Sequence, residues 1–200
     1  ALPILYQRIL SGGYQISTNI DTGLHDQLQG IVSNVMNAWQ DRSGDNNFYT
    51  KQAAMTVIDN QTGDVVASIG GRGEEGNHYN RAFLSYRQPG SAIKPLVSYA
   101  PAYERGLLET SVVSDDRPNN TYPNNVYNSS KGNLTLRNAL AISSNVVAYK
   151  LADENRNELK EAVYQPLAQM QFTGLDVADD NPIIAVGGMT YGATTQEMAS

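Results

Sequence analysis

Residues 87–95 read Arg-Gln-Pro-Gly-Ser-Ala-Ile-Lys-Pro, and this stretch decides how the rest of the chain is interpreted. Pro89 and Gly90 break the preceding chain, so the pattern predicts a new helix with Ser91 in its first turn. Ser91 and Lys94 are three residues apart and therefore share one face of that helix. The spacing predicts that the Lys94 amine lies close to the Ser91 hydroxyl.

This pair can support nucleophilic chemistry. A serine hydroxyl is a poor nucleophile until a neighbour removes its proton, and a lysine can do so when burial or nearby cations lower its pKa. The N-terminal end of a helix adds free N–H groups and positive potential, which favour the oxyanion of acyl transfer. Pro95 falls at most one turn into the helix, where its missing N–H costs little. The bare Ser-x-x-Lys spacing is also common in capped helices with an exposed lysine.

The flanking residues and a second segment carry a family resemblance. Residues 87–95 are similar to the active-site segment of class A penicillin-binding proteins, which reads RQPGS, two variable residues, then KP. Ser143-Ser144-Asn145 matches the Ser-x-Asn motif of that family, and the Ser-x-Asn spacing selects Ser143 over Ser144. Residues 13–18, the 53–70 region and Gly187-Gly188 extend the resemblance to nearly the whole chain from about residue 12. On their own, Ser143 and Asn145 are equally typical of one helix ending and another beginning.

The resemblance implies an α+β chain with the penicillin-binding/serine β-lactamase-like transpeptidase fold, truncated to a helical subdomain plus part of an antiparallel sheet. Residues 1–13 would be a connector from a preceding glycosyltransferase region, and residues 14–200 a partial transpeptidase domain. The third family motif, Lys-Thr/Ser-Gly on a strand, does not occur in the 200 residues. We therefore expect the isolated chain to be inactive or nearly so.

The resemblance also implies a role for each site residue. Ser91 would be the acylated nucleophile, and its backbone N–H would supply half of the oxyanion hole. Lys94 would be the general base, Ser143 would relay a proton to the leaving amine, and Asn145 would hydrogen-bond an amide of the substrate. No cofactor and no metal is implied.

The implied reaction is D,D-transpeptidation, in which the D-Ala-D-Ala end of a peptidoglycan stem peptide acylates Ser91 and an amine of a neighbouring stem accepts the acyl group. β-Lactams would acylate the same serine. One alternative is a D,D-carboxypeptidase or serine β-lactamase, in which Glu154, Glu158 or Glu161 would have to activate water. Another is a non-catalytic penicillin-binding sensor module. Turnover separates the three.

Composition limits the partners. The net charge is −6 and there is no basic stripe, so we expect no nucleic-acid partner. The chain has no cysteine and two histidines, His25 and His78, which we expect to be solvated bystanders. No run approaches the ~18 apolar residues of a membrane span. The resemblance implies an anchor before residue 1, a location at the extracytoplasmic face of a bacterial membrane, and possible cell-wall synthesis partners.

Periodicity predicts the following elements. They are a strand at 14–20, a helix capped by Asp21 with an apolar face from Leu24 to Trp39, a hairpin at 53–59 and 65–70, helical segments at 90–103, 135–153 and 157–170, and a capping box at Thr194 and Glu197. The acidic pairs Asp115-Asp116 and Asp179-Asp180 are expected in solvated turns.

Overall fold

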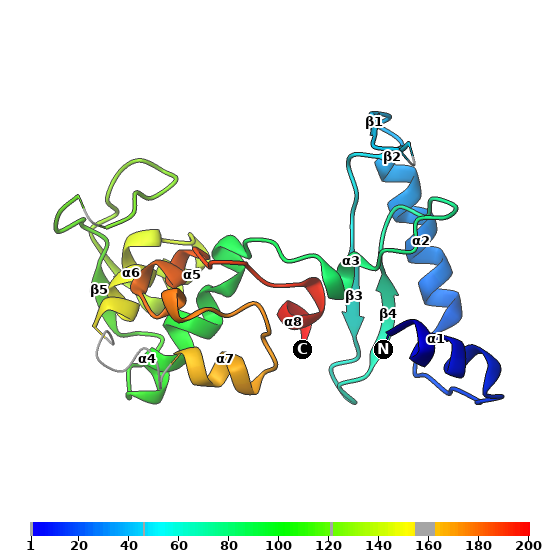
Figure 1. Cartoon of the computed structure of the whole chain (residues 1–200). Helices are drawn as coiled ribbons and strands as arrows, with labels where there is room; N and C mark the ends of the chain where they lie inside the picture. The colour runs from blue at the N-terminus through cyan, green and yellow to red at the C-terminus, as the bar shows by residue number, and fades with distance from the viewer. Residues whose placement is uncertain (1, 46, 121, 155–162) are drawn as a thin grey trace.

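The computed structural model describes residues 2–45, 47–120, 122–154 and 163–200, and it has two parts joined by short segments (Figure 1). The helices are α1 (Leu2–Ser11), α2 (Thr22–Met36), α3 (Arg81–Leu84), α4 (Ala100–Glu104), α5 (Leu136–Ala141), α6 (Asn145–Asp153), α7 (Gln165–Gln169) and α8 (Thr195–Ala199). The strands are β1 (Arg42–Ser43), β2 (Phe48–Tyr49), β3 (Met55–Ile58), β4 (Val65–Ile69), β5 (Val112–Ser114) and β6 (Asn133–Thr135). They form three two-stranded antiparallel sheets, β1-β2, β3-β4 and β5-β6.

The first part packs α2 against the β3-β4 hairpin. Asp21 caps α2, as predicted, because its side chain accepts a hydrogen bond from Leu24 N at 3.0 Å. Val32 and Met36 on α2 are buried against Ile69 on β4. The apolar stripe is therefore partly core: Leu24 and Leu28 are half-buried, whereas Ile31, Val35 and Trp39 are exposed.

The predicted hairpin is confirmed, with Met55 opposite Ile69 and a register shift between Val57 and Ile58. The strand predicted at residues 14–20 is wrong, because the structure assigns no strand there. A strand needs a partner along its length. Here the chain meets β4 at its far end, where Asp21 N donates to Val66 O at 2.9 Å. The connector expected at residues 1–13 contains α1.

The second part holds the larger core, built mainly from α4 to α7 and the segments between them (Figure 1). Its fully buried side chains include Ile93, Val97, Leu136, Val147, Leu151 and Ile184. The helical pattern at 135–153 is two helices, α5 and α6, separated by residues 142–144. The helix predicted at 157–170 lies partly outside the described residues, and α7 covers its last turn.

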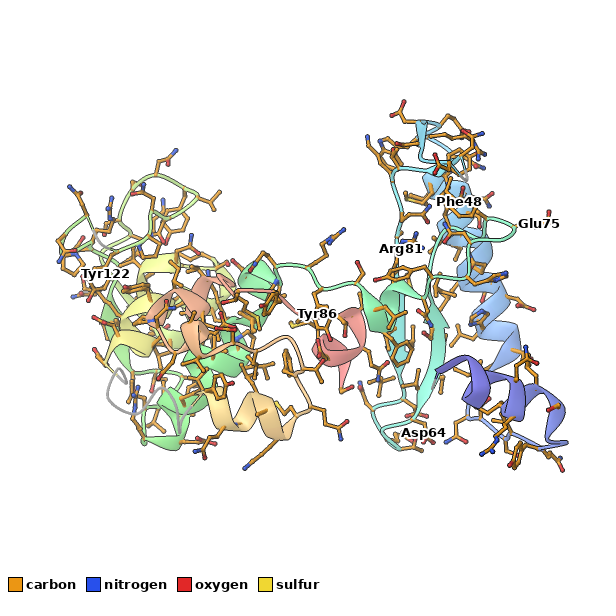
Figure 2. The ribbon with its side chains drawn as sticks, in the orientation of Figure 1. Phe48, Asp64, Glu75, Arg81, Tyr86 and Tyr122 are labelled. Carbon is orange, nitrogen blue, oxygen red and sulfur yellow. The ribbon has the colours of Figure 1, made fainter. Side chains whose placement is uncertain are left out.

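α8 links the two parts. The predicted capping box is confirmed, with Glu197 N bonded to Thr194 Oγ1 and Thr194 N bonded to Glu197 Oε2. Thr195 Oγ1 lies 3.1 Å from Thr56 Oγ1 on β3, which fastens α8 to the hairpin. Tyr86 lies between the two parts in Figure 2. Its hydroxyl is 2.6 Å from the hydroxyl of Thr173. The resulting α+β arrangement agrees with the expected fold class.

Candidate active site

Ser91 and Lys94 lie at a change of helix type. Residues Gly90–Ile93 form a 3-10 helix, and Pro95–Tyr99 form a π-helix. Pro95 has no N–H to donate to Ser91 O, so that carbonyl accepts from Lys94 N instead. Side chains three apart are eclipsed in a regular 3-10 helix, but Ser91 is exposed whereas Lys94 is fully buried. Within the described residues no hydrogen bond joins Ser91 Oγ to Lys94 Nζ, although the sequence predicted their contact.

The chain that leads to Ser91 is fixed against residues 187–193. Gly90 has φ +56° and Gly187 has φ +84°. A Cβ at position 187 would lie 2.3 Å from both N and Cα of Gly90, so only glycine permits this approach. The Gln88 side chain pairs with the backbone of Met189, donating to its carbonyl and accepting from its N–H at 2.9 Å. Arg87 and Ala193 form a two-way backbone bridge at 2.8 and 2.9 Å.

Lys94 is fully buried. Its Nζ donates to Ser143 O at 2.7 Å, to Ser143 Oγ at 3.0 Å and to Asn145 Oδ1 at 2.7 Å. These three acceptors use every N–H of an ammonium group. Burial disfavours the charged form and lowers the pKa of Lys94 to about 8. At pH 7 the Lys94 amine is therefore neutral in roughly a tenth of the molecules, and this free amine can act as a base.

Ser143 lies in the tight turn that ends α5. Its N–H bonds to Leu140 O at 2.9 Å, and the N–H of Ser144 bonds to Ala139 O at 2.9 Å. This pair of bonds is the Schellman motif, whose left-handed position usually holds glycine. Ser143 occupies that position with φ +56°. A strained backbone at a polar site persists when its surroundings hold it in place, and it points to a functional requirement for the side chain.

Ser143 and Ser144 face opposite directions. Ser144 is buried, its Oγ donates to Asp115 Oδ1 at 2.5 Å, and it accepts from Val147 N at 3.0 Å as the N-cap of α6. Ser143 instead faces Lys94. The structure thus brings together Lys94, Ser143 and Asn145, and it leaves Ser144 outside that group.

Asn145 begins α6 and retains hydrogen-bonding capacity. Its Oδ1 accepts from Lys94, and its Nδ2 donates to Asn124 O at 2.8 Å. An amide side chain has two lone pairs and two N–H groups, so one of each is left by these two bonds. Asn145 can therefore contact Lys94 and a substrate amide at the same time.

The prediction that the acidic pairs 115–116 and 179–180 lie in solvated turns is wrong for the first residue of each pair, Asp115 and Asp179. Asp115 is 1% exposed and Asp179 is 3% exposed. Burial by itself raises the pKa of Asp115, but hydrogen bonds from Ser144, Lys131 N, Asn125 and Tyr127 outweigh it and hold that pKa below its usual range. Asp179 Oδ1 accepts hydrogen bonds from the backbone N–H and the hydroxyl of Thr190.

Sequence reasoning missed Asp115, Asn124 and Asn125 as neighbours of the site. They lie in the long polar segment between β5 and β6, and no spacing or periodicity in that segment points to α6. Contacts across twenty or more residues bring them there: Asn125 Oδ1, for example, accepts from Asn145 N at 2.8 Å.

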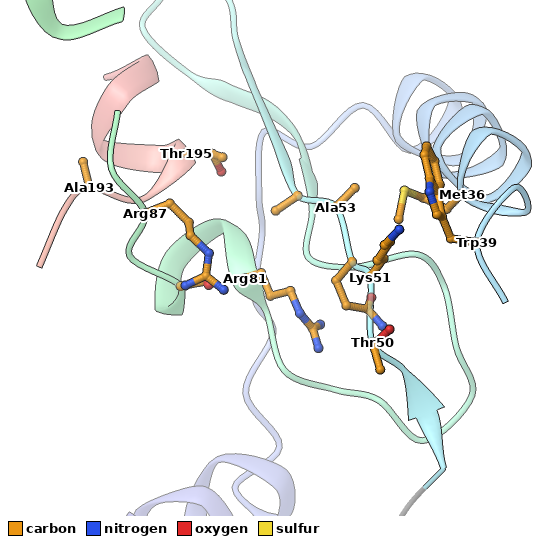
Figure 3. A pocket seen from close by; sticks show the side chains of 12 residues that line it. Met36, Trp39, Thr50, Lys51, Ala53, Arg81, Arg87, Ala193 and Thr195 are labelled. Carbon is orange, nitrogen blue, oxygen red and sulfur yellow. The ribbon is translucent and has the colours of Figure 1, made fainter. Parts of the chain in front are cut away.

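A cavity of about 560 Å³ is lined by residues of α2, of the segment before β3, of α3 and of the start of α8 (Figure 3). Its lining includes Trp39, Lys51, Arg81 and Arg87, but none of Ser91, Lys94, Ser143 or Asn145. It is therefore not the place where the predicted site residues meet.

The histidines and carboxylates do not form a metal centre in the described chain. His25 on α2 is half-buried, whereas the sequence predicted that it is solvated. His78 is exposed. Within the described residues no group of three histidine or acidic side chains could hold a metal ion. Across the same residues, no helix has both the length and the apolar character needed to cross a membrane.

Comparison with known proteins identifies relatives. Residues 53–182 match the family model for the penicillin binding protein transpeptidase domain. Penicillin-binding protein 1A of Clostridium perfringens is 34% identical over 207 residues, covering 92% of this chain and 30% of that protein. Penicillin-binding protein 4 of Bacillus subtilis is 34% identical, covering 95% of this chain and 29% of that protein. The chain spans between 25% and 30% of the length of these and similar curated relatives.

Solved structures show the same fold. Penicillin-binding protein 1A of Haemophilus influenzae superposes with a TM-score of 0.62 at 26% identity, over 78% of this chain and 24% of that chain. PonA1 of Mycobacterium tuberculosis superposes with a TM-score of 0.73 at 22% identity, over 97% of this chain and 50% of that chain.

Proposed function

The chain belongs to the penicillin-binding protein transpeptidase family, as its class A resemblance predicted, and from that premise we propose that its residues carry out serine acyl transfer on peptidoglycan. The observation that carries the proposal is the group of Lys94, Ser143 and Asn145, in which the buried amine of Lys94, with a lowered pKa, contacts two side chains of the Ser-x-Asn motif. A capped helix with a solvated lysine, the alternative for residues 87–95, does not account for a lysine that is fully buried.

The proposed first step is acylation. Neutral Lys94 takes the proton of Ser91 Oγ, and that oxygen attacks the carbonyl carbon between the two terminal D-alanines of a stem peptide. The backbone N–H of Ser91 stabilises the resulting oxyanion. The structure holds Lys94 toward Ser143, so a turn of the Ser91 or Lys94 side chain precedes proton transfer. Catalytic hydrogen bonds are often long before substrate binds.

Proton relay to the leaving group then follows from the Lys94–Ser143 contact. Lys94 as an ammonium donates to Ser143 Oγ, which in turn donates its own proton to the nitrogen of the departing D-alanine. The carbon–nitrogen bond breaks, and the acyl group remains on Ser91. An amine of a second stem peptide attacks this ester and completes the cross-link, with the same residues moving the proton in the opposite direction.

We also propose the finer points of domain organisation and location. Residues 1–13 connect to a preceding glycosyltransferase region with a membrane anchor, and residues 14–200 are part of a transpeptidase domain whose Lys-Thr/Ser-Gly strand lies beyond them. The site faces the extracytoplasmic side of a bacterial membrane, where stem peptides and cell-wall synthesis partners are found.

The hydrolytic alternative requires a glutamate that activates water. Glu154 lies at the C-terminal end of α6, whereas Asn145 lies at its start. Nine residues of helix separate the two ends by roughly 13 Å, which argues against Glu154 in that role. Glu158 and Glu161 lie outside the described residues. The alternative of a non-catalytic sensor module differs from an enzyme only in that the acylated protein neither forms cross-links nor hydrolyses the ester.

A fluorescent penicillin tests the proposal on the full-length protein, with Ser91→Ala as control and peptide mapping of the adduct. We expect a long-lived adduct on Ser91 that the control lacks. With a stem peptide and an amine acceptor, cross-linked product supports the transpeptidase, release of D-alanine without cross-linking supports the hydrolytic alternative, and an adduct without turnover supports the sensor. Absence of an adduct, or an adduct on another serine, contradicts the proposed function.

A further inference from the structure

A second buried polar group lies behind the Ser-x-Asn turn, on the side away from Lys94. We call it the Asp115 cluster, and it consists of Asp115, Asn125, Tyr127 and Ser144. Asp115 is 1% exposed, Asn125 is 7% exposed and Ser144 is fully buried. The mechanism above uses none of these side chains.

Asp115 accepts four hydrogen bonds. Its Oδ1 accepts from Ser144 Oγ at 2.5 Å and from Asn125 Nδ2 at 2.9 Å. Its Oδ2 accepts from Tyr127 OH and from Lys131 N, each at 2.9 Å. An ionised carboxylate accepts at both oxygens and has no proton to donate, and bonds to a charged acceptor are stronger than neutral ones. The cluster therefore requires a carboxylate at position 115.

The cluster is anchored to the sheet at one end. Asp115 directly follows β5, and its N–H donates to Gly132 O at 2.8 Å beside the β5-β6 pair. At the other end the cluster holds the start of α6. Asn125 Oδ1 accepts from Asn145 N at 2.8 Å and from Val146 N at 3.2 Å, and Ser144 Oγ caps the helix at Val147 N.

These hydrogen bonds hold the two residues that follow the strained Ser143, namely Ser144 and Asn145. Ser143 lies in the left-handed region, and its carbonyl and hydroxyl are two of the three acceptors around Lys94. The third acceptor is Asn145, whose backbone N–H bonds to Asn125. A residue in a strained conformation keeps it only when the surrounding structure fixes it. The end of α5 holds Ser143 from the N-terminal side, through Leu140 O and Ala139 O, and the Asp115 cluster holds the side that follows.

We propose that Asp115 is a positioning residue for acyl transfer, acting through Ser144 and Asn125 to hold the Ser143 and Asn145 acceptors around Lys94. This rests on the proposed function. With a neutral amide at position 115, one of its two oxygens becomes an N–H₂ group, and at least two of the four donors lose their acceptor. The turn then relaxes, and the Ser143 and Asn145 acceptors no longer hold the Lys94 amine in place.

The test uses the full-length protein and a fluorescent penicillin over a range of concentrations. For each variant the assay measures the limiting acylation rate and the penicillin concentration that gives half of that rate. The amplitude of the fluorescence signal measures the fraction of protein molecules that can be acylated. We expect Asp115→Asn to lower the limiting rate at least tenfold, with full amplitude and a half-saturating concentration within twofold of wild type. Asp116→Asn is the matched control, because Asp116 is the exposed neighbour and bonds to Ser114. It should stay within twofold throughout.

A second pair of variants applies if Asp115→Asn folds poorly. Ser144→Ala removes one donor to Asp115 while leaving its charge, and Ser144→Thr keeps the hydroxyl. We expect the alanine variant to lower the limiting rate and the threonine variant to restore it toward wild type.

A fall in amplitude with an unchanged limiting rate, in Asp115→Asn and in Ser144→Ala, would show that the cluster serves folding alone and would overturn the proposal. Wild-type values in both variants would overturn it as well. A wild-type protein that forms no Ser91 adduct is a different result, because it contradicts the proposed function before any variant is compared.

Discussion

Ser143 combines a strained backbone with a chemical role, and replacing it by glycine and by alanine separates the two. Its φ of +56° lies where the Schellman turn usually has glycine. Both substitutions remove the hydroxyl that lies 3.0 Å from Lys94 Nζ. Only the glycine variant also removes the steric conflict between Cβ and the left-handed backbone.

The magnitude follows from two opposing terms. A left-handed conformation costs an L-residue roughly 1–2 kcal/mol, and glycine escapes this cost. Glycine in turn makes the unfolded chain more flexible, which offsets about 0.4–1 kcal/mol of the gain. The free energy of unfolding of Ser143→Gly should therefore exceed that of Ser143→Ala by about 0.5–1 kcal/mol. For a domain of this size the difference raises the melting temperature by roughly 1–4 °C.

Activity should not follow stability. Because both variants lack the relay hydroxyl, we expect acylation by a fluorescent penicillin to fall by ~10²–10⁴ in each. Asn128, with φ +56° in an exposed loop, provides the control: Asn128→Gly and Asn128→Ala repeat the backbone comparison and should leave acylation unchanged. Equal melting temperatures for the two Ser143 variants would refute the strain, and near-normal acylation by either would refute the relay.

Three further results are expected. Burial lowers the pKa of Lys94 to about 8, and the base is the neutral form. The acylation rate should therefore rise about tenfold per pH unit below that value and level off above it, whereas a rate independent of pH between 6 and 9 would exclude Lys94 as the base. A Cβ at Gly187 would meet backbone atoms at 2.3 Å, while Gly106 has a similar φ of +90° with no atom within 4 Å. Gly187→Ala should then destabilise the protein by roughly 1–3 kcal/mol more than Gly106→Ala in urea unfolding, and equal losses would show that the close approach is unimportant. Gln88→Ala removes both side-chain bonds to Met189 and should cost about 1–3 kcal/mol and slow acylation. Unchanged stability and acylation in that variant would mean that the pairing does not hold the Ser91 segment.

Local sequence patterns predicted the features that depend on neighbouring residues. The caps at Asp21 and Thr194, the 53–70 hairpin and the helix that begins near Ser91 need only a side chain, a turn or a breaker within a few positions. The strand predicted at 14–20 failed for the complementary reason, because alternating side chains do not supply the partner strand that a ladder requires.

The helix after Ser91 is an intermediate case. Its existence follows from Pro89 and Gly90, but its winding changes from 3-10 to π at Pro95. The missing N–H of Pro95 is visible in the sequence. The response of the helix depends on how residues 95–99 pack against the core of the second part.

The sequence by itself determined the identity and spacing of Ser91, Lys94, Ser143 and Asn145, because covalent order fixes which side chains share a helical face or a turn. Tertiary structure alone decided that Lys94 is buried, that Ser143 and Asn145 surround its amine, and that Asp115 lies beneath the turn between them. The reason is physical, because contacts between residues 29 to 51 positions apart depend on how the helices pack. That packing buries Lys94, which lowers its pKa, and the hydrogen bonds fix its partners.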